Sequence, residues 1–300
     1  MRRNIGDFRF WIFDFGLFFS TRRHALRNIA NLKSKIKNSK FALYWALAAV
    51  LSACWGSWRW YIGRVATSPE ELWTLLALAT AVVFAVIAPK AERPRVPWLL
   101  PTLLLLAYAL GYHLLFPLAR AVLALAVLAA VISAFRFGVR LHPGICGLCV
   151  LALPVIPSLQ FYLGYPLRAL ATGATVLLLR PAGFFVQPEG TALRWGDTLV
   201  VVDAPCSGVK MLWVGCYLAC VLACAFSFGW RGTALAVGGT VLLVLLGNAL
   251  RAMALFLPEA GVVHLPAWGH DGVGLFVFAL TAVGIAAYLQ LLQRRRTCAG

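Results

Sequence analysis

Residues 233–257 read TALAVGGTVLLVLLGNALRAMALFL, a run whose single charged side chain is Arg251. A transmembrane helix needs about 20 consecutive apolar residues to cross a hydrocarbon core of about 30 Å. This run is long enough, and similar runs flank it at 209–228 and 273–292. The three runs together predict neighbouring membrane-spanning helices in the C-terminal part of the chain.

The rest of the chain is equally apolar. Hydrophobic residues make up 62% and charged residues 12% of the sequence, about half the charged share of ordinary soluble domains. The first long apolar run begins at Phe41, and no cleavable signal peptide is evident before it. The earlier apolar runs are 41–62, 72–88, 98–116, 118–135 and 144–163. We therefore expect an all-α polytopic membrane protein with about eight transmembrane helices.

The segment between the fifth and sixth runs has a different pattern. Residues 167–179 are short for a span and are typical of an interfacial or re-entrant helix. Residues 184–202 alternate around two turn signals, Pro188-Glu189-Gly190 and Trp195-Gly196-Asp197, which predicts short strands. Because the open edges of a sheet cannot face lipid, we expect residues 164–205 to form a small extracytoplasmic or interfacial β-like insertion.

The basic residues orient the chain in the membrane. Ten of the 27 Lys and Arg lie in residues 1–40, and three more lie at 294–296. With eight spans, 19 basic residues fall on the inner side and six on the outer side. The positive-inside rule then places both termini in the cytoplasm of a multi-pass protein of the cell's inner membrane. Since this charge flanks apolar spans and suits anionic lipid, we do not expect a nucleic-acid partner.

This topology divides the chain into five parts. Residues 1–40 form a basic cytoplasmic arm, and residues 41–163 form five N-terminal transmembrane spans. The insertion at 164–205 lies outside the cytoplasm. Residues 206–292 form a three-span core, and residues 293–300 form a basic cytoplasmic tail.

Three reactive groups meet on the outer side in this topology. Cys206 lies at the start of the sixth span, Arg251 about two turns below the outer end of the seventh, and His270 at the start of the eighth. We expect Pro205 to lie in the first turn of a helix. The positive end of that helix, with Lys210 on the same face, would lower the pKa of the Cys206 thiol.

Arg251 and His270 can serve such a thiol. A charged residue inside a span is costly and tends to mark function. Asn248 lies one turn before Arg251 and could orient it, although a structural salt bridge from Arg251 to Asp203 or Glu259 is the alternative. His270 is a candidate general base whose tautomer Asp271 or a backbone carbonyl would set. His264 is the rival histidine in the same loop.

The order of these residues resembles the exosortase/archaeosortase family. The matching elements are Cys-Ser-Gly at 206–208 with basic Lys210 close behind, Asn-x-x-Arg at 248–251 and His-Asp-x-x-Gly at 270–274. The resemblance covers about residues 160–290. Two features depart from it: Lys210 stands where many members have Arg, and Pro205 directly precedes the cysteine.

The resemblance implies a membrane cysteine peptidase/transpeptidase whose site is Cys206, Arg251 and His270. Its substrates would be exported proteins that end in a short motif, a transmembrane helix and a basic cluster. Cys206 would form a thioester acyl-enzyme, from which an acceptor, with a lipid-linked molecule as one candidate, releases the product. No cofactor or metal is implied.

Two other functions fit parts of the sequence. Lys210 and Arg251 within spans could serve a transporter without covalent chemistry, although neither an internal repeat nor matching broken helices are evident. The pair Cys146 and Cys149, with three cysteines at 216, 220 and 224, could indicate a membrane thiol oxidoreductase. Because these cysteines fall near the inner face or inside the bilayer, packing of small residues between helices is the simpler interpretation.

Overall fold

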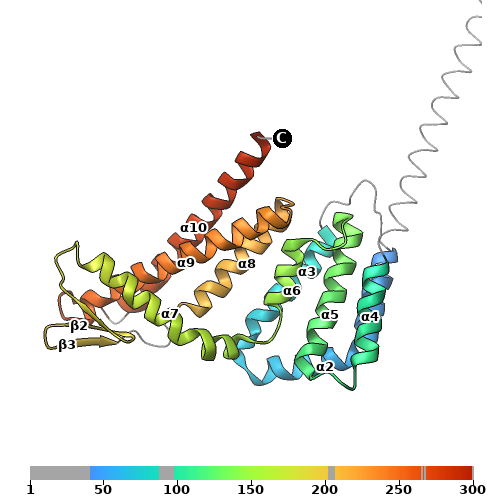
Figure 1. Ribbon diagram of the computed structural model, residues 1–300, viewed down its shortest axis with the longest axis horizontal. Helices are drawn as coiled ribbons and strands as arrows, with labels where there is room; N and C mark the ends of the chain where they lie inside the picture. Colours follow the sequence, from blue (N-terminus) through green and yellow to red (C-terminus); the bar gives the residue numbers. More distant parts are fainter. Residues whose placement is uncertain (1–40, 88–97, 202–206, 265, 267, 299–300) are drawn as a thin grey trace, which may run out of the picture. The chain divides into compact units, whose positions relative to one another are not determined.

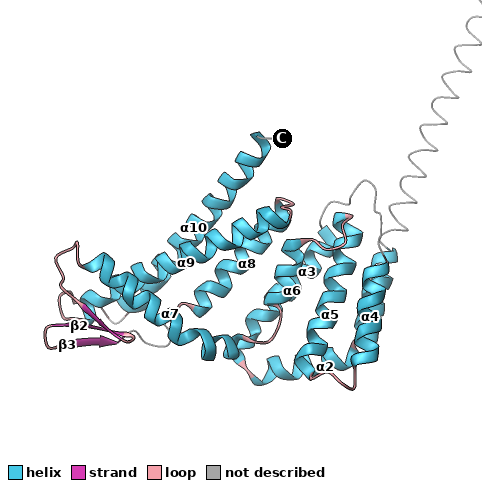
Figure 2. Ribbon diagram, viewed as in Figure 1, coloured by secondary structure: helices cyan, strands magenta, loops and turns pink. Residues whose placement is uncertain are grey.

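The computed structural model describes residues 41–87, 98–201, 207–264, 266 and 268–298. The chain divides into two units, Met1–Ala53 and Cys54–Gly300. The described part of the first unit is a helix, Phe41–Ala53. The second unit contains the remaining described helices and a small sheet (Figures 1 and 2).

Helices dominate the second unit, as the apolar runs predict. In chain order they are α2 Trp55–Thr67, α3 Leu72–Ile87, α4 Leu99–Gly111, α5 Pro117–Ile132, α6 Pro143–Leu151, α7 Ile156–Leu179, α8 Val209–Ala225, α9 Trp230–Glu259 and α10 Gly269–Cys298. A 3₁₀ turn, η1 Pro69–Glu71, precedes α3, and a π-helical turn, η2 Ser133–Phe137, follows α5. The prediction of an all-α polytopic membrane protein is confirmed.

The helix lengths support fewer spans than the eight apolar runs. Within the described residues, four helical segments are long and apolar enough to cross a membrane: Pro69–Ile87, Pro117–Phe137, Trp230–Glu259 and Gly269–Arg296. The number rises to six if two pairs of consecutive helices each count as one span. Helices α4 and α8, with 13 and 17 residues, fall short of the usual length. The expectation of eight spans stays a prediction.

The fifth expected span, 144–163, is not one helix. The chain forms the short helix α6 and then α7, which is turned by 94° from it. Pro154 has no backbone N–H to continue α6, whereas Pro157 fits the first turn of α7. Helix α7 then runs without interruption through Pro166. Residues 167–179, expected as a separate interfacial helix, are therefore the second half of α7.

The predicted strands form a three-stranded antiparallel sheet in the order β1-β2-β3, built from Gln187–Glu189, Ala192–Trp195 and Thr198–Val201. The two hairpin turns contain Gly190 and Gly196, whose φ angles of 63° and 60° favour glycine. Leu193 and Val200 of the sheet are buried and pack against Val176 and Leu179 of α7. The sheet therefore packs on the end of α7 (Figure 1).

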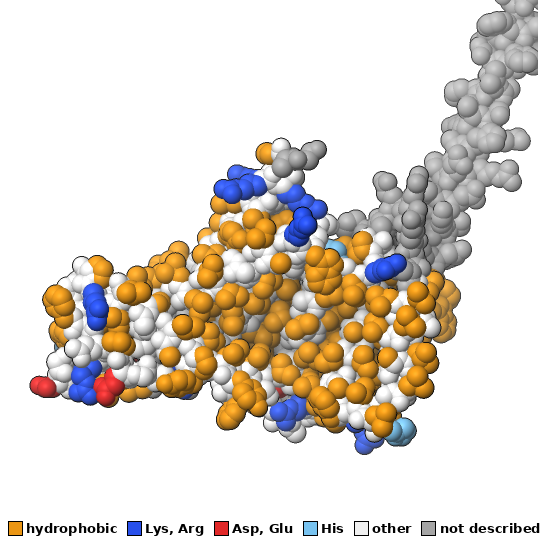
Figure 3. All heavy atoms as spheres, in the orientation of Figure 1, with side chains coloured by type: hydrophobic (Ala, Val, Ile, Leu, Met, Phe, Trp, Pro, Cys, Tyr) orange, Lys and Arg blue, Asp and Glu red, His pale blue; other side chains and the backbone are white. Residues whose placement is uncertain are grey.

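Small residues let the three C-terminal helices approach closely. A Cβ atom added to Gly247 of α9 would meet Thr281 of α10 and the methyl group of Met211 of α8. Glycine at such a contact allows close packing of helices in lipid. The opposite faces are apolar and open, since Leu242 of α9 and Leu275 and Phe276 of α10 are each about 70% exposed. Figure 3 shows the resulting apolar surface over the helices, which suits lipid.

Candidate functional site

The approach to α8 carries the candidate nucleophile. Cys206 lies outside the described residues, as do Asp203 and Pro205. Helix α8 begins at Val209 and has Gly208 as its N-cap, with a φ of 78°. Because a left-handed residue cannot continue an α-helix, α8 itself begins at Val209, where the apolar run 209–228 begins. The helical turn expected at Pro205 lies outside the described residues.

Gly208 lies against α9. A Cβ atom added to Gly208 would be 2.9 Å from Nδ2 of Asn248 and 3.0 Å from its Cγ. Asn248 is 3% exposed, so its side chain is held within the protein. The residue expected to orient Arg251 therefore touches the backbone two residues after Cys206.

Arg251 lies one turn after Asn248, where α9 meets α10. A Cβ atom added to Gly274 of α10 would be 3.2 Å from both Nε and Nη2 of Arg251. The Nε atom is buried and has no hydrogen-bond partner among the described residues. A buried N–H donor without a partner is unfavourable. The Nε–H of the positively charged guanidinium is therefore available to donate a hydrogen bond between α9 and α10.

His270 lies in the first turn of α10, one turn before Gly274. Its Nε2 atom is 3.5 Å from Oε1 of Glu259, the last residue of α9. The sequence suggests Glu259 only as a partner of Arg251, and it suggests Asp271 or a backbone carbonyl as the group that orients the imidazole. In the structure Asp271 is an exposed acid in the first turn of α10, and His264 is exposed in the preceding loop. The sequence gives no signal for the contact between Glu259 and His270.

A tight turn ends α9 and leads towards His270. Gly261 has a φ of 74°. The N–H of Gly261 donates to the carbonyl of Pro258 at 3.1 Å, and that of Val262 donates to the carbonyl of Leu257 at 2.9 Å. These two bonds form a Schellman motif, which satisfies the last carbonyls of the helix. Glu259 is thus fixed at the helix end, beside the loop that leads to α10.

A cluster of three aromatic rings connects the sheet to this end of α9. Phe184, Trp195 and Phe256 pack edge to face, with ring centroids 5.7–6.1 Å apart. Phe256 lies on α9 between Arg251 and Glu259 and belongs to the core of the sheet. The insertion that the sequence places outside the membrane therefore packs against the segment of α9 that carries the candidate residues.

Lys210 has a partner that we did not predict. Its Nζ atom is 3.4 Å from Oε1 of Glu70 in η1, and both side chains are substantially exposed. Glu70 is far away in the sequence, so no local pattern could reveal this pair. Lys210 therefore contacts a carboxylate at the surface, which weakens the expected effect of its charge on the thiol.

Helix lengths separate the candidate residues from the basic tail. At 1.5 Å per residue, Arg251 lies about 32 Å along α9 from Trp230, and His270 lies about 39 Å along α10 from Arg296. Both distances match or exceed a hydrocarbon core of about 30 Å. Arg251 and His270 are therefore near the ends of their helices opposite to the basic tail.

Two of the other cysteines pack between α6 and α8. Gly144 and Gly147 of α6 lie against Cys224 and Cys220 of α8, so closely that a Cβ atom at either glycine would collide with the sulfur atom. The seven cysteines of the described residues are all free thiols. Within the same residues, no group of three or more His, Cys, Asp or Glu side chains could hold a metal ion. These contacts fit the packing interpretation of the cysteine pattern.

Comparison with known proteins identifies the family. The family model described as transmembrane exosortase matches residues 32–287, most of the chain. No curated protein and no solved structure matches the chain. The matched range includes the helices α2–α10 up to the last turns of α10, together with Cys206, Arg251 and His270. The chain therefore belongs to the transmembrane exosortase family, whose members process sorting signals of exported proteins at a membrane.

Proposed function

We propose that this protein is a cysteine peptidase, with transpeptidase activity, whose site consists of Cys206, Arg251 and His270. It cleaves the C-terminal sorting signal of exported proteins through a thioester intermediate. The substrate ends in a short motif, a transmembrane helix and a basic cluster. Asn248 and Glu259 support the three reactive residues.

One observation carries this proposal: Asn248 and Arg251 of α9 contact the N-cap of α8 and the first turns of α10, next to the segments that carry Cys206 and His270. Asn248 touches Gly208, and two peptide links separate Gly208 from Cys206. Arg251 touches Gly274, one turn after His270. A packing role alone does not require a charged guanidinium at this junction whose buried Nε–H has no partner among the described residues.

The chemistry follows from these side chains. His270 takes the proton of the Cys206 thiol, and the thiolate sulfur attacks the carbonyl carbon of the scissile peptide bond. Arg251 stabilises the negative charge that develops on the carbonyl oxygen. The C–N bond then breaks, and His270 returns the proton to the leaving amine. An acceptor nucleophile or water finally attacks the thioester, releases the product and restores the thiol.

The same proposal includes the topology. The basic tail lies in the cytoplasm, and the candidate residues lie at the outer side of the inner membrane, with the sheet beside them. This suits a substrate whose transmembrane helix anchors it and presents the cleavage motif just outside the membrane. The basic cluster at the end of the substrate stays on the inner side by the positive-inside rule.

The test is processing of a reporter in a host cell. The protein is co-expressed with an exported reporter that carries a candidate sorting tail from the same genome, and reporter size is compared on a gel. Cleavage by the wild type should disappear with Cys206→Ala, Arg251→Ala and His270→Ala. His264→Ala is the matched control and should cleave normally.

Three results would contradict the proposal. Cleavage that survives Cys206→Ala removes the assigned nucleophile. Equal losses with His264→Ala and His270→Ala would remove the assigned base. Transport of a solute that survives Cys206→Ala, with no cleavage of any tail, would favour the transporter alternative.

A further inference from the structure

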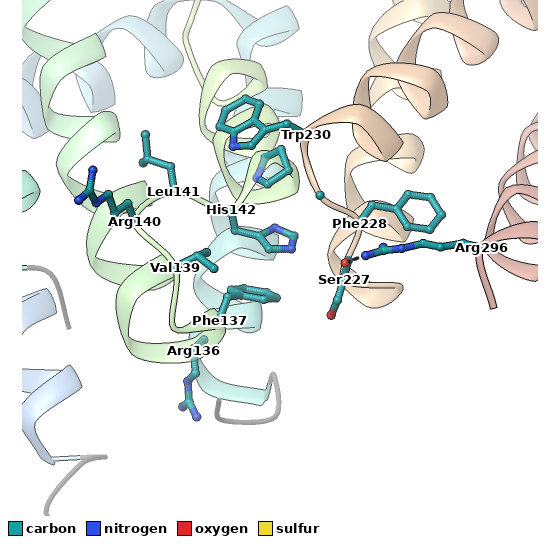
Figure 4. A pocket seen from close by; sticks show the side chains of 12 residues that line it. Arg136, Phe137, Val139, Arg140, Leu141, His142, Ser227, Phe228, Trp230 and Arg296 are labelled. Atoms are coloured by element: carbon teal, nitrogen blue, oxygen red, sulfur yellow. Dashed lines mark hydrogen bonds between the residues drawn. The ribbon is translucent and has the colours of Figure 1, made fainter. Parts of the chain in front are cut away.

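A cavity of about 670 Å³ lies at the end of the bundle that carries the basic tail. It opens between two turns, the one from α5 to α6 and the one from α8 to α9, and the last turns of α10 reach it (Figure 4). The polar residues of its lining are Arg136, Arg140, His142, Ser227 and Arg296. The guanidinium of Arg136 already donates to the carbonyls of Ala85 and Val86. The candidate peptidase residues lie at the other ends of α9 and α10, so this cavity is not part of that site.

His142 is held rigidly in the wall of the cavity. Its ring stacks on Phe137 with a centroid distance of 4.0 Å, and its backbone N–H donates to Oγ of Ser133 at 2.9 Å. Nδ1 lies 4.0 Å from the sulfur of Cys224. The His142 residue is only 5% exposed, and its Nε2 atom is buried without a hydrogen-bond partner among the described residues. Burial lowers the pKa of His142 to about 4, so the ring is neutral at physiological pH.

Arg296 reaches the same cavity from α10. Its Nη1 atom donates to the carbonyl of Ser227 at 3.1 Å, which uses one of the five N–H donors of the guanidinium. Figure 4 shows the guanidinium of Arg296 and the imidazole of His142 extending towards each other from opposite walls, with Arg140 at the rim and turned away. A cation and a neutral ring donor that face one cavity suit an oxygen-rich anion.

The apolar walls favour a lipid as the source of that anion. Phe137, Leu141 and Phe228 line the cavity beside the polar groups. Trp230, at the start of α9, also lines it and is 61% exposed. Tryptophan is enriched at the boundary between lipid and water. Basic pockets between transmembrane helices on the cytoplasmic side bind anionic headgroups.

We propose that this cavity binds the phosphate group of an anionic phospholipid from the inner leaflet. Arg296 and His142 donate hydrogen bonds to the phosphate oxygens, and the acyl chains lie along the apolar walls. The inference depends on the cytoplasmic position of the tail and not on the peptidase activity.

Lipid titration of the purified full-length protein tests the proposal. Native mass spectrometry in a mild detergent gives the dissociation constants of phosphatidylglycerol and phosphatidylcholine for the wild type and for Arg296→Ala, His142→Ala and Arg295→Ala. Arg295→Ala is the matched control, because Arg295 carries the same charge on the next residue but does not line the cavity. Arg296 is exposed, so its substitution does not threaten folding even if that of buried His142 does.

We expect one phosphatidylglycerol site that Arg296→Ala and His142→Ala each weaken by about tenfold, the ratio for loss of one charge-assisted hydrogen bond. Arg295→Ala should leave this affinity within about twofold. An equal loss with Arg295→Ala would show diffuse charge attraction and overturn the proposal. Unchanged affinity with Arg296→Ala would overturn it too. Displacement of the lipid by inorganic phosphate in large excess would identify a soluble phosphate as the ligand and overturn the lipid assignment.

Discussion

Gly208→Ala should disturb the candidate site through one identifiable contact. The residue has a φ of 78°, and a left-handed conformation costs a residue with a Cβ atom about 1–2 kcal/mol. The added methyl group would also lie 2.9 Å from Nδ2 of Asn248. Asn248 is buried and cannot simply turn away, so this overpacking adds about 1–3 kcal/mol.

Gly196→Ala is the matched control for the backbone term. Gly196 also has a positive φ, of 60°, but a Cβ atom there would meet nothing within 4 Å. The difference between the two variants therefore isolates the contact with Asn248. Asn248→Ala removes the amide that the methyl group meets, so Gly208→Ala should cost less stability in the Asn248→Ala background than in the wild type.

Two assays measure the effect. The apparent midpoint of thermal unfolding in detergent should fall further for Gly208→Ala than for Gly196→Ala. The rate of reporter cleavage should fall by about 10- to 100-fold for Gly208→Ala, because misplacement of reacting groups by about 1 Å has a cost of that order. Gly196→Ala should cleave at nearly the wild-type rate. Equal behaviour of the two glycine variants in both assays would refute the assigned contact between Gly208 and Asn248.

Three further changes have outcomes that follow from the contacts. Glu259→Gln should slow cleavage by up to about fivefold, the factor for loss of one partly exposed ion pair, because Glu259 lies 3.5 Å from the imidazole of His270. Glu189→Gln on the sheet is the control and should not slow cleavage. Equal rates for the two variants would show that Glu259 does not position the imidazole. Lys210→Ala should change stability by less than about 1 kcal/mol and by less still at high salt, measured by thermal unfolding, because it loses only an exposed ion pair. Gly147→Ala should lower the unfolding midpoint and Cys220→Ala should restore it in the double variant, because the added methyl group meets the sulfur; no recovery would disprove this contact.

The apolar runs were sufficient to predict most helices of the fold. An uninterrupted run such as 233–257 has one stable form in lipid, so α9 follows from its composition. The glycines at 190 and 196 similarly predict the hairpins of the sheet, because their turns need a positive φ. These are local properties of the chain, and a single sequence contains them in full.

The break between α6 and α7 was harder to predict. Pro154, Pro157 and Pro166 all interrupt apolar sequence, but only the first ends a helix in the structure. A proline in the first turn of a helix has little cost, and one inside a helix is tolerated where neighbouring helices support it. Whether a given proline ends a helix or is tolerated in it depends on tertiary packing, and this packing cannot be derived from a single sequence.

The candidate site shows the same division. The positions of Arg251 and His270 near the ends of their helices follow from counting residues along apolar runs. Their contacts do not: the pairs of His270 with Glu259 and of Lys210 with Glu70 arise from chain folding. Asp271 was the natural choice for His270 because it is adjacent in sequence, but adjacent residues on a helix point in different directions.

The most direct test of the central hypothesis is detection of the acyl-enzyme at Cys206. Wild-type protein co-expressed with a tailed reporter is quenched in acid, and its peptides are analysed by mass spectrometry. The account predicts a reporter fragment joined to the Cys206 sulfur through a thioester that hydroxylamine cleaves, and no such adduct in Cys206→Ala. Efficient reporter cleavage with the fragment on another residue, or with the same adduct in Cys206→Ala cells, would contradict it.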